Sequence, residues 1–514
     1  MNSPAPARPP SPGRRGGKHQ RELVEGPITK TLLIFSLPVL GGNFLQSLNS
    51  SVNQFWVSHT LGVSAITAIG NSTIVMMLML GAIFGISMAA NILVAQAVGA
   101  GDFRQVKKVM GTAVTFFMVL AALIGAVGYF AAPAILGLMG TPAVSKAEAE
   151  IYLRIVFLAM PFMCLFAFLQ MAQRGAGDSK TPFYFLLLAI VLDIILNPLL
   201  IRGVGPFPRL GIAGSACSTL IGQGFSLVCL IVTLYRMKSP LMLTWRDLHL
   251  LKPDLQIASS LLLRGLPMGF QMIVMSGAAM VMIGFVNSFG AVTSAAYTAA
   301  SQLWTYLQMP AMALGASISS MAAQNIGAGR WDRVGKVAIS GVLSSLVITA
   351  SIAVVIYLLG DAPLLLFLPG GTPAMPIARH INHLVLWSMA LFSVTFALSG
   401  IVRSTGAVMV PLVILIVSTW LIRIPFTWLL IPRWGEDAIW WSFPLGILVS
   451  AGLSILYYRF GGWRNVRMLK ARSEPAGEAS DTGMGAPVMD IPIEDDLAEE
   501  AQAERAAVER GAPA

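Results

Sequence analysis

Twelve long apolar runs dominate this sequence. Each reaches the roughly 20 residues that an α-helix needs to cross the hydrocarbon core of a bilayer. They lie at residues 31–57, 64–94, 108–135, 151–173, 182–202, 210–235, 260–288, 293–322, 337–360, 382–402, 408–431 and 438–459. Because the runs are continuous and do not alternate between apolar and polar residues, they favour helices over the strands of a membrane barrel. We therefore predict an all-α integral membrane protein with twelve transmembrane helices.

The low content of charged residues excludes an ordinary water-soluble enzyme. Charged residues make up 11% of the chain, whereas soluble globular proteins carry about 25%. The three cysteines and five scattered histidines show no spacing typical of a zinc or haem site. A membrane enzyme would need clustered His, Cys or acidic residues near one face, and no such cluster is found. We expect a protein that is not an enzyme and that holds no metal and no organic cofactor.

The positions of Lys and Arg predict the orientation in the membrane. Cytoplasmic loops carry an excess of these residues. The N-terminal arm and the loops after the second, fourth, sixth and eighth runs are basic, while the loops between them are thinly charged. Because the number of runs is even, both termini should lie in the cytoplasm. This pattern explains the net charge of +10, so we expect the lipid bilayer and no nucleic acid as a partner.

Composition divides the chain into five segments. Residues 1–25 are rich in Pro, Arg and Gly and lack a signal-peptide pattern, which predicts a disordered cytoplasmic arm. Residues 26–236 and 257–460 hold six runs each and are named here the N-lobe and the C-lobe. Residues 237–256 form the cytoplasmic loop between them. Residues 461–514 hold 11 acidic and 6 basic residues among many Ala and Gly, which predicts a disordered cytoplasmic tail.

The two lobes are related by an internal repeat. Residues 95–101 (Ala-Gln-Ala-Val-Gly-Ala-Gly) match residues 323–329 (Ala-Gln-Asn-Ile-Gly-Ala-Gly), 228 positions later. Two more anchors recur at an offset of 229: Leu37-Pro38 with Leu266-Pro267, and Arg174, Gly177 and Pro182 with Arg403, Gly406 and Pro411. Since each half has six runs, both halves have the same orientation, and the pseudo-symmetry axis follows the membrane normal. Two six-helix lobes of this kind enclose a cleft, and rocking them gives alternating access, which favours a transporter.

Three Gly-Ala-Gly segments do not match a phosphate-binding loop. They lie at residues 99–101, 175–177 and 327–329, with no preceding strand and no following Gly-Lys-Ser/Thr. We expect tight turns that end helices on the cytoplasmic side. ATP-driven transport therefore has no support in this chain.

One acidic residue, Asp193, lies inside an apolar run. It follows 11 residues after the start of the fifth run, which is roughly 16 Å deep at 1.5 Å per residue. A charged carboxylate near the middle of the bilayer costs about 3 kcal/mol or more unless it is neutralised or faces water. Low-dielectric surroundings disfavour the charged form of a carboxyl group, so such a group can take up and release a proton. We interpret Asp193 as a proton-coupling residue; the alternative is a structural acid bonded to a neighbouring helix.

Arg423 is the one basic residue deep inside a run. Aligning Leu199-Leu200-Ile201 with Leu429-Leu430-Ile431, at an offset of 230, places Arg423 opposite Asp193 under the pseudo-symmetry. The two residues could pair across the cleft in one conformation. Alternatively, Arg423 anchors its own helix or extends toward the surface. We place it in a candidate substrate cleft, together with Gln54, Gln271 and Met275.

These motifs together resemble the multidrug and toxic compound extrusion (MATE) family. The resemblance covers about residues 26–460. It rests on Leu37-Pro38, residues 95–101, residues 173–182 (Gln-Arg-Gly-Ala-Gly-Asp-Ser-Lys-Thr-Pro), residues 197–201 (Asn-Pro-Leu-Leu-Ile) and their echoes in the second half. The resemblance implies a secondary active antiporter that exports cationic or amphipathic compounds, driven by inward protons or sodium.

The chain departs from the family pattern at the expected ion-coupling positions. Where the family often has an acid in the first span, this chain has Asn53, and where some members have Asn followed by Asp, it has Asp193 followed by Asn197. The second-lobe acids that sodium-coupled members use are absent; Met275 lies near one of those positions. We therefore expect protons rather than sodium as the coupling ion, at a site built from Asp193, Asn53 and Asn197.

Two other functions remain open at this point. One is a sodium-coupled exporter. The other is a flippase for lipid-linked saccharides, whose phosphate-bearing substrates should need a basic cleft; Arg423 is nearly the only deep cation, which disfavours it. We expect a monomer in the bacterial plasma (inner) membrane that exports small-molecule drugs or metabolites.

Overall fold

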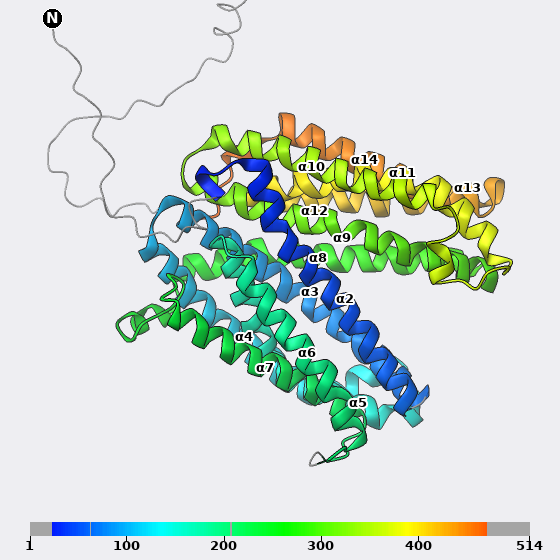
Figure 1. The fold of residues 1–514 in the computed structure, drawn as a ribbon, viewed down its shortest axis with the longest axis horizontal. Coiled ribbons are helices and arrows are strands. Elements are labelled where there is room, and N and C mark those ends of the chain that lie inside the picture. Colours follow the sequence, from blue (N-terminus) through cyan, green and yellow to red (C-terminus); the bar gives the residue numbers. More distant parts are fainter. Residues whose placement is uncertain (1–22, 62, 206–207, 470–514) are drawn as a thin grey trace, which may run out of the picture. The chain divides into compact units, whose positions relative to one another are not determined.

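The computed structural model describes residues 23–61, 63–205 and 208–469. These residues belong to one compact unit that ends at Leu469. Its N-lobe helices are α2 (Ile28–Leu61), α3 (Val63–Ala100), α4 (Phe103–Leu138), α5 (Ala143–Gly175), α6 (Lys180–Arg202) and α7 (Ile212–Arg236). Its C-lobe helices are α8 (Leu255–Asn287), α9 (Ala291–Gly327), α10 (Trp331–Leu358), α11 (Ala374–Ser404), α12 (Met409–Ile416), η3 (Val417–Arg423), α13 (Ile424–Trp434) and α14 (Asp437–Phe460). Each predicted run falls on one of these elements and extends past it by two residues at most, with α12, η3 and α13 continuous, so the twelve-helix plan is confirmed (Figure 1).

Helix α9 differs from the other spans in polarity. Within the described residues, eleven spans are long and apolar enough to cross a membrane, and α9 is not among them. Its side chains Ser317, Ser320, Gln324 and Asn325 are polar and buried. A helix surrounded by other helices can carry polar groups that bond to its neighbours, because it presents little surface to lipid. Helix α9 is thus an inner helix of the C-lobe.

The helix boundaries follow the internal repeat. Helices α3, α4 and α6 begin at residues 63, 103 and 180, and α9, α10 and α12 begin at residues 291, 331 and 409. The Gly-Ala-Gly segments end helices as predicted, with φ values of 71° at Gly101, 94° at Gly177 and 72° at Gly329. Glycine is favoured there because a side chain disfavours positive φ.

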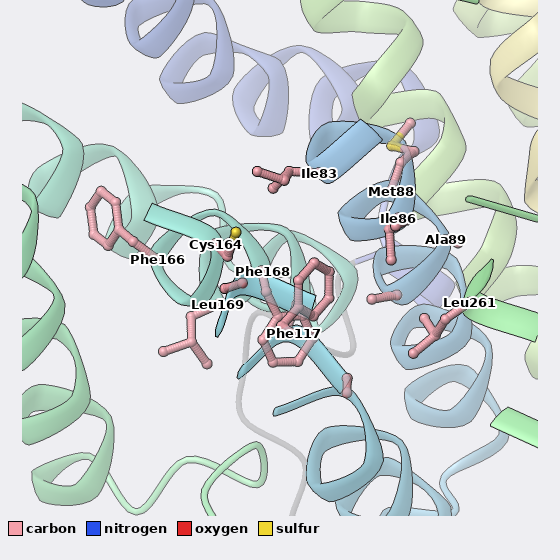
Figure 2. Close-up of a cluster of buried hydrophobic side chains, with 14 of the residues drawn as sticks. Ile83, Ile86, Met88, Ala89, Phe117, Cys164, Phe166, Phe168, Leu169 and Leu261 are labelled. Carbon is pink, nitrogen blue, oxygen red and sulfur yellow. The ribbon is translucent and has the colours of Figure 1, made fainter. Parts of the chain in front are cut away.

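The first helix of each lobe begins against the other lobe. Near the start of α2, Leu32 and Phe35 pack in one buried cluster with Leu314 and Ile318 of α9. Near the start of α8, Leu261 packs in the buried cluster of the N-lobe. Figure 2 shows Leu261 near Ala89 and Ile86 of α3, with Phe117 and Phe168 in the same cluster. The two lobes are therefore interlocked by reciprocal first helices.

The folded part of the chain extends beyond the predicted lobe boundaries. Leu23 is 1% exposed, although it lies in the predicted N-terminal arm. At the other end, Gly462–Asn465 forms a short 3-10 helix, η4, and Trp463 and Met468 are buried. The loop between the lobes contains another 3-10 helix, η1 (Trp245–Leu251). The remainder of the predicted arm and tail, residues 1–22 and 470–514, lies outside the described residues.

Two glycines allow α3 and α9 to cross in direct backbone contact. A Cβ atom on Gly99 would lie 1.9 Å from the carbonyl oxygen of Gln324, and one on Gly327 would lie 1.9 Å from that of Gln96. Both pairs are related by the offset of 228. The two lobes therefore meet about the pseudo-symmetry axis, on the side where the Gly-Ala-Gly turns lie.

The same two glutamines bond across the lobes. Nε2 of Gln96 in α3 donates to the carbonyl oxygen of Ser404 at the end of α11, at 2.7 Å. Nε2 of Gln324 in α9 donates to the carbonyl oxygen of Gly175 at the end of α5, at 2.8 Å. These reciprocal bonds, together with the glycine crossing, hold the lobes together on the side predicted to be cytoplasmic.

Candidate functional site

Asp193 lies in α6 between α2 and α7, with an exposed fraction of 3%. Its Oδ1 accepts hydrogen bonds from the hydroxyls of Ser218 (2.6 Å) and Thr219 (3.2 Å) of α7. Its Oδ2 accepts from Nδ2 of Asn49 (3.0 Å) and of Asn53 (2.9 Å) of α2. A buried carboxylate is stable only when it is paired or fully hydrogen-bonded. Four donors on two oxygens meet that requirement without a cation.

Small residues bring the neighbouring helices close to α6. A Cβ atom on Gly222 of α7 would lie 2.8 Å from the carbonyl oxygen of Ala189, one turn before Asp193. A Cβ atom on Gly41 of α2 would lie 2.8 Å from the ring of Phe183. Glycines at these crossings let the backbones approach. The approach puts short side chains such as Asn and Ser within bonding distance of the carboxylate.

The three predicted coupling residues lie in one hydrogen-bond network. Nδ2 of Asn197, a fully buried residue, donates to Oδ1 of Asn53 at 2.7 Å, and Asn53 in turn donates to Asp193. Two buried amide oxygens of this network, Oδ1 of Asn49 and of Asn197, have no hydrogen-bond partner. They are acceptors for a proton donor, a water molecule or a small cation. Elsewhere, no group of three His, Cys, Asp or Glu placed to hold a metal ion occurs among the described residues.

Both hydroxyl groups beside Asp193 have an alternative acceptor. The hydroxyls of Ser218 and Thr219 also lie 2.9 Å and 3.4 Å from the carbonyl oxygen of Ser215 on their own helix. A hydroxyl has a single proton to donate. Each can therefore bond to the carboxylate, or turn to Ser215 when the carboxyl is protonated, without leaving a buried donor unpaired.

Exposed polar residues lie next to the Asp193 network along α2. Asn49 and Asn53 are half-buried, and Gln46 and Ser50, one turn earlier on the same helix, are exposed. Residues three and four apart share one face of a helix. Asp193 is thus enclosed within the N-lobe, while exposed polar residues lie on the same face of α2 as its amide partners.

Arg423 lies in the C-lobe, at the end of η3. Its guanidinium carbon is 3.4 Å from the centre of the Phe443 ring of α14. Its Nε is buried without a hydrogen-bond partner. In the conformation described, Asp193 is bonded within the N-lobe and Arg423 contacts the C-lobe. Their pairing in another conformation stays a prediction.

Gln271 and Met275, two of the remaining predicted cleft residues, are not part of the Asp193 network among the described contacts. Gln271 and Met275 lie one turn apart on α8; Met275 is 39% exposed, and Nε2 of Gln271 is buried without a partner. Neither forms a side-chain hydrogen bond to Asp193 or Arg423 among the described contacts. Gln54 lies on α2, and its side chain is outside the described residues.

Sequence reasoning missed three of the four direct partners of Asp193, namely Asn49, Ser218 and Thr219. One signal was available, because Asn49 and Asn53 are four residues apart and so share a helix face. The hydroxyl residues of α7 carry no comparable signal. A search restricted to charged residues inside apolar runs finds the carboxylate and not its donors.

Comparisons with known proteins identify the family of this chain. The family model described as MatE matches residues 38–199 and 267–429, one match in each lobe and more than half of the chain. The "Probable multidrug resistance protein YoeA" of Bacillus subtilis (strain 168) is 35% identical over 435 residues, covering 84% of this chain and 94% of the relative. The "Probable multidrug resistance protein YpnP" of the same organism is 31% identical over 453 residues, covering 87% and 98%.

A solved structure gives the same fold. It is described as the outward-facing conformation of a multidrug resistance MATE family transporter of the MOP superfamily. It matches with a TM-score of 0.80 at 19% identity, covering 88% of this chain and 100% of that chain. At this identity the likeness concerns the fold alone.

Proposed function

This chain belongs to the MATE (MatE) family of efflux transporters, and on that premise we propose that it is a proton-driven antiporter. It exports cationic or amphipathic drugs or metabolites across the bacterial plasma membrane by alternating access. The observation that carries the proton coupling is the buried carboxyl of Asp193, bonded to α2 and α7 by groups that tolerate both of its protonation states. The names of the relatives support drug efflux.

A proton on Asp193 weakens the link between α6 and α2. A hydrogen bond to a charged group contributes about 1.5–3 kcal/mol and one between neutral groups about 0.5–1.5 kcal/mol. Protonation therefore weakens the bonds from Asn49 and Asn53 by on the order of 2 kcal/mol together. Helix α2 also packs against α9 near its start. A change in the packing of α2 against α6 thus also changes the contact between the lobes. In this way protonation of Asp193 is coupled to alternating access.

The test uses purified protein in lipid vesicles with either a pH gradient or a sodium gradient imposed. Ethidium movement is followed by fluorescence. We expect the pH gradient to drive movement in the wild type. Asp193→Asn should abolish this movement while the protein still folds, because the amide takes up no proton. Asp332→Asn, at an exposed site in the first turn of α10, should transport like the wild type. Wild-type rates in Asp193→Asn would refute the coupling role.

Sodium is the second candidate for the coupling ion, and one observation favours it. The unpartnered amide oxygens of Asn49 and Asn197 lie in the network of the Asp193 carboxylate. Small hard cations prefer oxygen ligands of this kind. Ethidium movement driven by a sodium gradient, with equal pH on both sides, would establish sodium in place of protons.

A further inference from the structure

Arg423 is a cation in the membrane-spanning part of the C-lobe with no anion beside it. Its Nε is buried and unpartnered. Within the described residues, no acidic side chain forms an ion pair with its guanidinium, and no oxygen accepts a hydrogen bond from it. An ionised residue inside the membrane is costly, and such residues mark substrate or ion pathways by default. The C-lobe therefore carries a positive charge that its own side chains leave uncompensated.

Arg423 is the last residue of a π-helical segment, which sets its position in the span. Val417–Arg423 is π-helical, whereas the equivalent helix of the N-lobe, α6, is a regular α-helix. Each bond of a π-helix spans five residues in place of four, so the segment accommodates an extra residue. The repeat records this residue, because Pro182 and Pro411 are 229 positions apart while Leu199 and Leu429 are 230 apart. The insertion makes Arg423 the counterpart of Asp193, and π-segments occur frequently at functional sites.

The π-helix is fixed to the neighbouring helix by Trp420. Its Nε1 donates to the carbonyl oxygen of Val274 in α8 at 3.1 Å. A Cβ atom on Gly277 would lie 3.0 Å from the Trp420 ring, so glycine leaves room for the indole. With Trp420 held on α8, Arg423 is directed toward α14, where Phe443 lies under its guanidinium. The orientation of the cation is thus built into the fold.

The surroundings of Arg423 offer aromatic faces, and no acceptor among the described residues is hydrogen-bonded to its Nε. The Phe443 ring centre is 5.0 Å from that of Trp304 and 6.1 Å from that of Tyr297. Tyr297 stacks on Trp440, whose buried Nε1 also has no hydrogen-bond partner. Both unpartnered groups are therefore donors. Phe443 contacts the guanidinium over the ring, and the N–H groups lie in the guanidinium plane, where an acceptor would meet them.

We propose that Arg423 binds the carboxylate of an aromatic substrate. The inference rests on the proposed function, since it assigns a substrate class to the exporter: aromatic zwitterions and anions that carry a carboxyl group. A carboxylate accepts two parallel N–H bonds from one guanidinium. Tyr297 and Phe443 are buried in this conformation, so the aromatic part of the substrate contacts their rings only after the C-lobe helices rearrange for transport. A phosphate monoester carries nearly two charges, which a single arginine does not balance, so the carboxylate is the better match.

The test compares a fluoroquinolone, which is an aromatic carboxylic acid, with its methyl ester. Binding of each compound to the purified full-length protein is measured by fluorescence titration. The wild type should bind the acid roughly ten- to a hundredfold more tightly than the ester, the range for a hydrogen bond between charged groups. Arg423→Gln should remove this preference and leave ester binding unchanged. Arg433→Gln, at an exposed position later in the same span, should keep the wild-type preference.

Further measurements keep the proposal falsifiable. Size-exclusion elution and the midpoint of thermal unfolding report whether Arg423→Gln is folded. Arg423→Lys keeps the charge but not the planar fork, so it should show an intermediate preference for the acid. The proposal is overturned if the wild type binds the acid no more tightly than the ester. It is also overturned if folded Arg423→Gln loses affinity for the acid and the ester equally. Failure of a pH gradient to move ethidium would instead refute the proposed coupling, whatever the acid-to-ester ratio.

Discussion

Asp193 and Arg423 show how one position of a repeat can take opposite chemistry. Asp193 is bonded by four donors, so the N-lobe satisfies its own charge. Arg423 contacts a ring, and its Nε has no hydrogen-bond partner among the described residues. A charged residue whose hydrogen bonds come from its own lobe can gain or lose a proton without a ligand. A charged residue that lacks a counter-ion instead provides a place for a ligand of opposite charge. This contrast is the reason for assigning coupling to the N-lobe and substrate recognition to the C-lobe.

At the same scale, the glycine crossing gives a sharp prediction. Gly327→Ala would place a Cβ atom 1.9 Å from the carbonyl oxygen of Gln96. Because the clash is with the backbone, α3 and α9 must separate. Overpacking typically destabilises a protein by roughly 1–3 kcal/mol, and we expect the loss here to reach or exceed this range. The midpoint of thermal unfolding in detergent should fall.

Gly335→Ala is the matched control. Gly335 lies within α10, and a Cβ atom there would meet no atom within 4 Å. Alanine is favoured over glycine in a helix by up to about 1 kcal/mol, so this variant should unfold at the same temperature or higher. Equal midpoints for Gly327→Ala and Gly335→Ala would contradict the crossing.

The candidate site was predictable from sequence only in part, for a physical reason. A carboxylate or an amide stands out in an apolar run, so Asp193, Asn53 and Asn197 could be found. Ser and Thr do not stand out, because they commonly bond to the carbonyl group three or four residues earlier in their own helix, as Thr73 does to Ile69. The sequence therefore does not tell which hydroxyl, such as that of Ser218, faces a site.

At the scale of helices, hydropathy located every span but not its ends. The run predicted at residues 108–135 belongs to α4 (Phe103–Leu138), and that at residues 293–322 belongs to α9 (Ala291–Gly327). Apolar residues mark only the part of a helix inside the hydrocarbon core. Polar residues such as Lys107 and Gln324 continue the helix beyond it, because the backbone still needs its hydrogen bonds. The π-helix leaves no trace in hydropathy and is visible only as the change in repeat offset.

The loop between the lobes is docked on α4 by two ion pairs. Lys107 pairs with Asp247 at 2.6 Å, and Lys108 pairs with Asp254 at 2.5 Å. The hydrogen bond from Lys107 holds the pKa of Asp247 well below its usual value, and that from Lys108 lowers the pKa of Asp254. A carboxyl group with a lowered pKa stabilises the docked loop above its unfolded pKa of about 4 and loses this contribution as the pH falls through the folded value. We expect η1 to be docked at neutral pH and released only in strong acid.

Hydrogen–deuterium exchange of residues 245–251, expressed as protection factors, checks this prediction. Lys107→Met should lower protection at pH 7 already, because Asp247 then loses its charged partner. Lys252→Met, at an exposed position in the same loop, should leave protection unchanged. If Lys107→Met and Lys252→Met exchange alike, the ion pair does not hold the loop.

At the scale of the whole molecule, the repeat predicted two matched lobes but not how they interlock. The offset shows that α2 and α8 are equivalent. It does not show that each starts in a buried cluster of the opposite lobe. Hydropathy indicates that a helix face is apolar but does not predict which helix packs against it. In the folded chain, α2 contacts both α9 and the Asp193 network, so a single helix connects the coupling site to the lobe contact (Figure 1).

The reciprocal glutamine bonds give the last prediction. Gln96→Ala together with Gln324→Ala removes both bonds between the lobes on the side of the Gly-Ala-Gly turns. Each bond contributes about 0.5–1.5 kcal/mol, so the pair should shift the equilibrium toward opening on this side by more than tenfold, on the order of 2 kcal/mol. Spin labels at Arg104 and Asp332, which are exposed and related by the repeat, should then show a new, longer distance.

The single variants Gln96→Ala and Gln324→Ala show whether the two glutamine bonds themselves keep this side closed, or whether the double variant destabilises the whole protein. Both bonds oppose the same opening motion, so their free energies should add, and each single variant should give about half of the double variant's shift in free energy. Gln302→Ala removes an exposed glutamine of α9 that bridges no lobes, and the distance distribution should not change. An unchanged distribution in the double variant would mean that the glycine crossing of α3 and α9 closes this side alone. In that case Gly327→Ala should produce the longer distance, since it separates the same two helices at their point of contact.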